Sequence, residues 1–290
     1  MNPLPQAPAS LVDEGGAPRF GLYRGRMADT SLGALAGRFR RAGLARLAEK
    51  RWLYASVASP ELLAAFAVVD LGWGAGGFCY VFDRAGRCLV ADETFRLPGK
   101  LVEVRDRAGE AWARLRSPRS RMSIAIAPSF GRISASVPGL LAEVRLLPSG
   151  SPAPLTAVCP VPGDGVSMTQ KAPLVPAEGE IRVGGRVFAL SRAFASLDLT
   201  HGYLARSTCW RWASGCGLLA DGRRFGINLV QGHNDGPVSE NGLWLEDRLW
   251  PLGEARFDFD PDRPAEPWSI STDDGRVQLR PRIDGDPELG

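Results

Sequence analysis

Histidine is almost absent from this chain of 290 residues, in which only His201 and His233 occur. A metal centre built from several histidines is therefore excluded, and a mixed histidine and carboxylate site remains as the less favoured alternative. The cysteines are odd in number and contain no C-x-x-C pair: Cys79, Cys88, Cys159, Cys209 and Cys216. This pattern argues against a disulfide framework and against a thiolate zinc site. We expect no metal.

Long hydrophobic runs are also missing. No run of about 18 uninterrupted apolar residues occurs, so we expect no integral membrane association. The first residues, MNPLPQAPASLVDEGG, contain neither the basic nor the apolar region of a secretory signal. The apolar fraction of 44% and the charged fraction of 23% are those of an ordinary folded protein. We therefore expect a cytoplasmic protein.

Positive charge is concentrated near the N-terminus, although the net charge is only +3. Nine basic residues lie in one stretch: Arg19, Arg24, Arg26, Arg38, Arg40, Arg41, Arg46, Lys50 and Arg51. Residues 30–50 suit a short basic helix with Leu32, Leu35 and Phe39 on one side, although three glycines weaken the pattern. Such a segment either contacts phosphates or anionic lipid or forms a solvated face. No nucleic-acid motif accompanies it, so we expect no nucleic-acid partner.

Short apolar segments separated by Gly, Pro, Asp or Ser follow Arg51, and several of them alternate in polarity. This pattern of short segments predicts an all-β chain that forms a barrel or sandwich in two halves. We divide it into an arm and basic helix (1–50), a first β half (51–150), a Pro/Gly-rich connection (151–178) and a second β half (179–290). The connection contains one expected strand, LTAVCPV, and the second half begins with a hairpin around Gly184 and Gly185.

The glycines Gly72, Gly74 and Gly77 match G-x-G-x-x-G but precede the strand-like FCYVFD. Dinucleotide binding would need a helix at that point, so we interpret the glycines as a turn and expect no cofactor.

Two tryptophans in CWRWASG, Trp210 and Trp212, stand two residues apart, so both indoles point to one face of a strand. They form either a core wall or the lining of a ligand cavity, because small barrels can enclose one ligand.

The most polar segment is GINLVQGHNDGPVSENGLW, which we interpret as a hairpin with a long polar loop. Loops of this length are often functional, but Asn and Asp also serve turn chemistry. Within the loop, Glu240 with His233 is the plausible acid/base element. The other polar or aromatic candidates are Asn228, Gln231, Asp235, Asn241 and Trp244.

Several long motifs in order, among them KRWLYASVASPELLAAFAVVDLGWGAGGFCYVFD, TQKAPLVPAEGEIRVGG, WRWASG and PWSISTDDGRVQL, resemble the bacterial domain-of-unknown-function family 2804. This resemblance implies no particular activity. Family members resemble one another over further strands, so the second half here is expected to be incomplete at its C-terminus. An unpaired sheet edge would follow, and with it a homodimer or a tendency to aggregate.

A more distant resemblance concerns Thr169-Gln170-Lys171, the hairpin, L-D-x-x-x-G and W-x-W, which are similar to the hydroxyneurosporene synthase and AttH-like superfamily. It implies two lipocalin-like halves, an apolar cavity and protonation of a double bond without a redox cofactor. The hydratases show D-H-x-W-G; Asp198 and Gly202 match, whereas Leu199 replaces the histidine and His201 the tryptophan. His201 would then act as a displaced proton donor, or the site would only bind.

These patterns lead to one main hypothesis, the binding of an apolar or amphipathic small molecule in a Trp-lined barrel cavity, with cofactor-free hydration, cyclisation or isomerisation. The expected catalytic residues are Asp198, His201 and Glu240, and Lys171, Trp210, Trp212, Asn228, Gln231, His233, Asp235, Asn241 and Trp244 are the expected ligand-binding residues. The alternative is a non-enzymatic module that docks on an anionic membrane surface or a protein through its basic segment.

Overall fold

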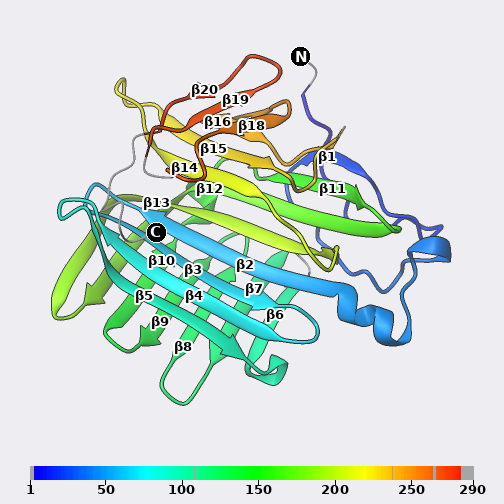
Figure 1. Ribbon diagram of the computed structural model, residues 1–290, viewed down its shortest axis with the longest axis horizontal. Coiled ribbons are helices and arrows are strands. Elements are labelled where there is room, and N and C mark those ends of the chain that lie inside the picture. The colour runs from blue at the N-terminus through cyan, green and yellow to red at the C-terminus, as the bar shows by residue number, and fades with distance from the viewer. Residues whose placement is uncertain (1–2, 108, 237, 264–265, 282–290) are drawn as a thin grey trace.

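The computed structural model describes residues 3–107, 109–236, 238–263 and 266–281, and strands dominate this part of the chain (Figure 1). The strands up to residue 146 are β1 (Gly21–Arg24), β2 (Glu49–Ala58), β3 (Leu62–Asp70), β4 (Ala75–Asp83), β5 (Cys88–Leu97), β6 (Val102–Arg107), β7 (Glu110–Arg116), β8 (Arg121–Ile126), β9 (Gly131–Val137) and β10 (Leu140–Leu146). They are followed by β11 (Leu155–Val161), β12 (Gly165–Val183), β13 (Arg186–Tyr203), β14 (Arg211–Leu218), β15 (Arg224–Gln231), β16 (Gly242–Leu245), β17 (Arg248–Pro251), β18 (Ala255–Asp258), β19 (Ser269–Thr272) and β20 (Gln278–Leu279). Short 3-10 helices occur at η1 (Gly37–Phe39), η2 (Gly43–Ala48), η3 (Gly99–Leu101) and η4 (Pro148–Gly150).

Alternating side chains explain why these segments form strands. In β10, Leu140, Ala142, Val144 and Leu146 are buried and the residues between them are exposed. This period of two residues places one face of the strand in the core and the other in water. The all-β prediction is confirmed.

The largest sheet is antiparallel, with the strand order β5-β4-β3-β2-β13-β12-β10-β9-β8-β7-β6, and β11 and β1 continue from β12. It curls until β6 contacts β3, so that the two ends of the sheet approach each other. The resulting nearly closed barrel is filled by side chains of its inner face, including Leu53, Phe66, Leu115, Ile124 and Ile133, which are fully buried.

The strands β12 and β13 connect the two parts of the molecule. They form one long hairpin around Gly184 and Gly185, whose φ values of 55° and 90° suit a tight turn that favours glycine. The end of β12 pairs with β10 and its beginning with β11. The stretch 151–178, expected to be a connection, therefore holds β11 and most of β12, and LTAVCPV is a strand as predicted.

The predicted basic helix over residues 30–50 is wrong. Within the described residues this segment contains only the 3-10 helices η1 and η2 before β2 begins. Gly37 and Gly43 have φ values of 55° and 57°, a left-handed conformation that interrupts a right-handed helix. Leu32 and Leu35 are instead buried in the core from the two ends of a turn, in which the Leu35 amide donates to the Leu32 carbonyl.

Several basic residues of this segment contact the protein itself. Arg38 lies 3.6 Å from the carboxylate of Asp164, and Arg41 donates a hydrogen bond to the Gly163 carbonyl. Arg51 forms an ion pair with Glu49. The basic residues therefore do not form one side of a helix for docking.

The N-terminal arm belongs to the barrel rather than hanging loosely beside it. Backbone bridges join Gln6 to Arg24 and Ser10 to Asp29. Leu11 and Met27 are completely buried in the main core. Figure 1 shows this arm in dark blue at one end of the large sheet.

Two small sheets are stacked over the outer face of the large one (Figure 1). The first has the order β14-β15-β16-β17 and contacts β12 and β13. The second, β18-β19-β20, packs on the other side of the first through Leu229, Phe257 and Ile270. The molecule is thus layered at this point, and the space between the first two layers holds the site described below.

The expectation of missing strands after Arg280 concerns residues 282–290, which lie outside the described residues, so the expected homodimer stays a prediction. In the described part of the chain, no helix has both the length and the apolar character needed to span a membrane.

Candidate functional site

The site begins with the two faces of β13. Asp198 and Thr200 point outward toward the small sheet, whereas Leu199 and His201 share the opposite, inner face, because side chains alternate along a strand. Asp198 pairs in register with Lys171 of β12 on one side and with Tyr54 of β2 on the other. Three neighbouring strands therefore place three polar side chains side by side on the outer face of the barrel.

A cavity of about 290 Å³ lies between this outer face and the small sheet. Its lining is mostly aromatic and aliphatic and consists of Lys50, Trp52, Tyr54, Ala67, Val69, Leu71, Phe78, Lys171, Asp198, Leu204, Thr208, Trp210, Trp212, Val230, His233 and Glu240. The predicted Trp-lined cavity therefore lies between sheets and not inside the barrel, because the inner face of the barrel is packed with core side chains.

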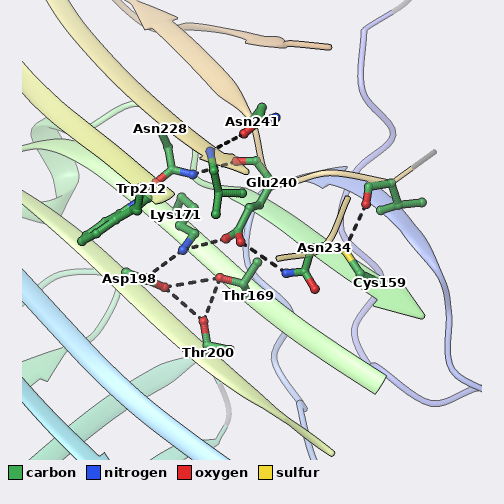
Figure 2. Close-up of polar contacts among 12 residues, drawn as sticks. Cys159, Thr169, Lys171, Asp198, Thr200, Trp212, Asn228, Asn234, Glu240 and Asn241 are labelled. Carbon is green, nitrogen blue, oxygen red and sulfur yellow. Dashed lines mark hydrogen bonds and ion pairs between the residues drawn. The ribbon is translucent and has the colours of Figure 1, made fainter. Parts of the chain in front are cut away.

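Lys171, Asp198 and Glu240 form a buried triad (Figure 2), and all three line the cavity. The Nζ of Lys171 lies 2.7 Å from Oδ2 of Asp198 and 2.7 Å from Oε2 of Glu240. The three residues are 5%, 8% and 2% exposed, respectively. The hydroxyls of Thr169 and Thr200 lie 3.3 and 3.2 Å from Oδ1 of Asp198 and 3.0 Å from each other.

Electrostatics keep Lys171 charged. Burial on its own would lower the pKa of Lys171, but Asp198 and Glu240 act against burial and raise this pKa above its ordinary value. Lys171 therefore places a positive charge between two carboxyl groups.

Two tryptophans are held at defined positions in the cavity wall. The Nε1 of Trp212 donates a hydrogen bond of 2.8 Å to Asn228, which in turn donates to the Glu240 carbonyl at 2.9 Å. The ring of Trp212 lies 5.7 Å from the Lys171 ammonium, within cation–π range. On β2, Tyr54 meets Trp212 edge to face at 5.0 Å.

Trp210 stacks nearly parallel to Trp52, with ring centroids 6.4 Å apart, and its other neighbour is His233 at 5.6 Å. Trp210 and Trp212 both line the cavity. Of the two arrangements that the sequence left open, a core wall or a cavity lining, these side chains have the second.

The polar loop between β15 and β16 serves both the turn and the site. Asp235 accepts hydrogen bonds from the Gly232 amide, which is turn chemistry. Asn234, at a φ of 56°, donates to Oε1 of Glu240 at 3.3 Å. His233 lines the cavity, and burial lowers its pKa, so its neutral form is favoured. Its Nε2 is buried and finds no hydrogen-bond partner within the described residues.

His201, expected as a displaced proton donor, does not reach the cavity. Its Nε2 lies 2.9 Å from Oε1 of Glu49 on the inner face of the sheet, where burial lowers the pKa of His201. The adjacent Gly202 of the same motif is explained by close packing, since a Cβ there would lie 2.2 Å from the Val166 carbonyl oxygen.

Three other predicted ligand-binding residues have structural contacts instead. Gln231 accepts a hydrogen bond from the Phe257 amide. Asn241 accepts a hydrogen bond from the Val230 amide and donates one to the Gly253 carbonyl. Trp244 is fully buried and donates to the Ala153 carbonyl at 3.0 Å. None of the three lines the cavity.

The sequence analysis missed the contribution of β2 and its neighbours, chiefly Lys50, Trp52, Tyr54 and Phe78. The signal was present, because Lys50, Trp52 and Tyr54 alternate in K-R-W-L-Y and must share one face of a strand. Which strand would lie opposite Trp212 could not be read from that pattern. In the described part of the chain, no group of three histidine, cysteine or acidic residues is arranged to hold a metal ion.

Two solved structures are similar to this chain. The chain is 14% identical to the AttH-like protein NE1406 of Nitrosomonas europaea, covering 80% of this chain and 79% of that one with a TM-score of 0.46. It is 9% identical to kievitone hydratase of Nectria haematococca, covering 77% of this chain and 72% of that one with a TM-score of 0.51. The second likeness shows a common fold. No curated protein matches the chain.

The family expected from the sequence motifs is confirmed. The model of the family described as "Domain of unknown function (DUF2804)" matches residues 4–283, which is nearly the whole chain. The protein belongs to the DUF2804 family.

Proposed function

We propose that the protein binds an apolar or amphipathic small molecule between its two facing sheets and transfers protons to and from it without a cofactor. The single observation that carries this proposal is the triad of Lys171, Asp198 and Glu240, which opens into an aromatic cavity. Largely apolar cavities with a few convergent polar groups are the usual form of small-molecule sites.

The cost of the triad supports a functional role. Removing three charged groups from water is unfavourable, and replacement of buried ion pairs by apolar residues is often neutral or stabilising. A triad retained beside Trp212 and Tyr54 is therefore better explained by ligand chemistry than by stability alone. Buried ionisable groups in a cleft are candidates for a functional site on the same ground.

The chemistry that fits is addition to a carbon–carbon double bond. In the reactive form one carboxyl group of the pair, that of Asp198 or Glu240, carries a proton taken up from solvent. It gives this proton to one carbon, and a water oxygen bonds to the other. The added water then loses a proton to the carboxylate, so the site is restored and no electrons are gained or lost. Lys171 stabilises the carboxylate that forms, and neutral His233 is suited to orient the water. Loss of a carbon-bound proton in place of water addition gives isomerisation.

The kievitone hydratase likeness agrees with hydration as one of these reactions, since the fold is shared with a protein of that name. At 9% identity, the choice of hydration over isomerisation or cyclisation rests on experiment.

Binding is tested with a neutral apolar fluorophore, N-phenyl-1-naphthylamine. We expect it to bind the wild-type protein and to bind Trp212→Ala about tenfold more weakly, because one wall of the cavity is removed. Trp73→Ala is the matched control, since Trp73 is 72% exposed and does not line the cavity. Equal binding by wild type and Trp212→Ala, or no binding at all, would overturn the cavity as the ligand site.

Proton transfer is tested on the small molecule that co-purifies with the protein, identified by mass spectrometry. Incubation in deuterium oxide should introduce deuterium at carbon in the presence of wild-type protein, and not with Asp198→Asn/Glu240→Gln. Retention of the ligand without deuterium uptake would leave a binding protein and refute the catalytic part of the proposal.

A further inference from the structure

A second positive charge lines the same cavity at its other end. Lys50, Trp52 and Tyr54 alternate on β2, so they share the outer face, and all three line the cavity. Their partners in register on β13 are Gly202, Thr200 and Asp198. Lys50 is thus separated from the Asp198 end by four residues of strand, or about 13 Å at 3.3 Å per residue.

The two lysines differ in their partners. Lys171 lies between two carboxylates, whereas Lys50 has no carboxylate partner among the described residues. The Nζ of Lys50 donates to the carbonyls of Ala205 at 2.6 Å and Arg206 at 3.4 Å. An ammonium has three N–H donors, so one donor remains for a ligand. Its positive charge also remains available, because its two partners are neutral carbonyl groups.

The wall between the two lysines is apolar. Ala67 and Val69 alternate on β3 beside Trp52, Leu71 directly follows this strand, and all three line the cavity. Trp210, which directly precedes β14, stacks on Trp52. Trp210 is 46% exposed, while the triad at the far end is almost completely buried. The cavity is therefore an apolar slot, with a cation at its open end and the proton-transferring groups at its closed end.

We infer that the ligand of this slot is a linear amphipathic anion, a monocarboxylate of the fatty-acid type, with its carboxylate on Lys50 and its unsaturated carbon chain reaching the triad. This inference rests on the proposed function and names its substrate class. A carboxylate matches the single charge that Lys50 offers, whereas phosphate recognition generally draws on several cations or a fork of guanidinium donors.

The spacing also sets the length of the ligand. An apolar chain must cover about 13 Å before it reaches Asp198, so acids of about ten or more carbons should fill the slot. Shorter acids would bind the cation and leave the triad unoccupied. Each methylene buried in the slot should strengthen binding by about 0.8 kcal/mol, or roughly fourfold in affinity, until the chain reaches the triad.

The test compares laurate with 1-dodecanol, which share the chain and differ in the head group, by displacement of N-phenyl-1-naphthylamine. We expect laurate to bind wild-type protein about tenfold more tightly than the alcohol, as one charge-assisted hydrogen bond implies. Lys50→Gln should remove this preference and leave alcohol binding unchanged, and Lys50→Arg should restore it. Lys100→Gln is the control, because Lys100 is an exposed lysine that does not line the cavity. Laurate should also bind more tightly than octanoate.

Equal affinity of wild-type protein for laurate and dodecanol would overturn the inference while leaving the cavity as a ligand site. An equal loss of both ligands in Lys50→Gln would also overturn it, since Lys50 would then only hold the Ala205 backbone in place. Tighter binding of dodecyl phosphate than of laurate would overturn the inferred carboxylate head group in favour of a phosphate. Failure of the wild-type protein to bind the neutral fluorophore would instead refute the proposed function itself.

Discussion

At the scale of single residues, Lys171 is the group whose removal has the clearest consequence. Without its ammonium, Asp198 and Glu240 would face each other in a buried site with no counter-charge. We expect Lys171→Met to lower the free energy of unfolding by about 3–5 kcal/mol at neutral pH, as for other broken buried pairs. Urea denaturation followed by tryptophan fluorescence measures this loss.

The control for this prediction is the triple variant Lys171→Met/Asp198→Asn/Glu240→Gln, which removes all three charges. It should recover much of the lost stability, since no charge remains unpaired. A single Lys171→Met variant as stable as the wild type would show that water enters the site freely and solvates both carboxylates.

Replacement of Asp198 distinguishes a catalytic role of this residue from a structural one. Asp198→Asn keeps the shape of the side chain but cannot exchange a proton at useful pH, so we expect deuterium transfer to the ligand to fall by about 100-fold or more with binding nearly unchanged. Activity is expressed per folded molecule, with the folded fraction taken from circular dichroism. A variant with a lower melting temperature and unchanged activity per folded molecule would assign Asp198 a purely structural role.

Individual residues also show how far sequence reasoning reaches. The period of two residues correctly placed Trp210 and Trp212 in one wall. The same period explains why His201, expected as a displaced proton donor, does not reach the site beside Asp198, since three positions along a strand lead to the opposite face. Trp244 and Gln231 were predicted as site residues because a sequence shows their aromatic or polar character. It does not show how far each side chain lies from the cavity.

At the scale of elements, the paired ends of β2 and β13 form a second polar cluster, in which Glu49 contacts both His201 and Arg51. The hydrogen bond with His201, together with the hydrogen bond and charge of Arg51, outweighs burial and lowers the pKa of Glu49 from 4.5 to about 2. A carboxyl whose pKa is depressed by folding contributes stability above its unfolded pKa and loses it as the pH falls toward the folded value. This contribution is therefore complete at neutral pH and disappears between about pH 4.5 and 2.

We expect Glu49→Gln to lower the free energy of unfolding by about 1–2 kcal/mol at pH 7, a discounted value because the group is only partly buried. The difference from wild type should shrink below pH 4.5 and vanish near pH 2, as followed by urea denaturation across pH. Glu61→Gln, at an exposed acid in the turn after β2, is the control. A constant difference at every pH would mean that Glu49 acts through packing and not through its charge.

Elements were predicted best where turns and alternation agree, as in the hairpin at Gly184 and Gly185. The prediction of a helix over 30–50 failed because Leu32 and Leu35 have helical spacing but are buried from a single turn that does not continue as a helix. There, tertiary packing outweighs local propensity. Proline and glycine in 151–178 suggested a connection, whereas the chain forms β11 and most of β12, whose register shifts near Leu174 at a φ of 61°.

At the scale of the whole molecule, the site is assembled from segments far apart in the chain. Lys50 to Tyr54, Lys171, Asp198, Trp212 and Glu240 meet because the small sheet folds back over β2, β12 and β13. A single sequence carries the residue types and the strand faces, but not which sheet lies against which. The sequence therefore predicted an aromatic cavity, but it could not show that this cavity lies between two sheets.

The last prediction concerns the N-terminal arm, whose side chains belong to the barrel core. Leu11 and Met27 are completely buried, and Leu32 and Leu35 are nearly so. We expect Met27→Ala to lower the free energy of unfolding by about 2–5 kcal/mol, because a large core side chain leaves a cavity. Val187→Ala, at a side chain that is 50% exposed, should change it by about 0.5 kcal/mol or less. Deletion of residues 1–36 removes all four core side chains and should abolish cooperative unfolding, measured by near-ultraviolet circular dichroism during heating. Because the cavity lies on the outer face of this same barrel, ligand binding should be lost together with the fold. A truncated protein that unfolds cooperatively near the wild-type midpoint would show that the barrel closes without its arm.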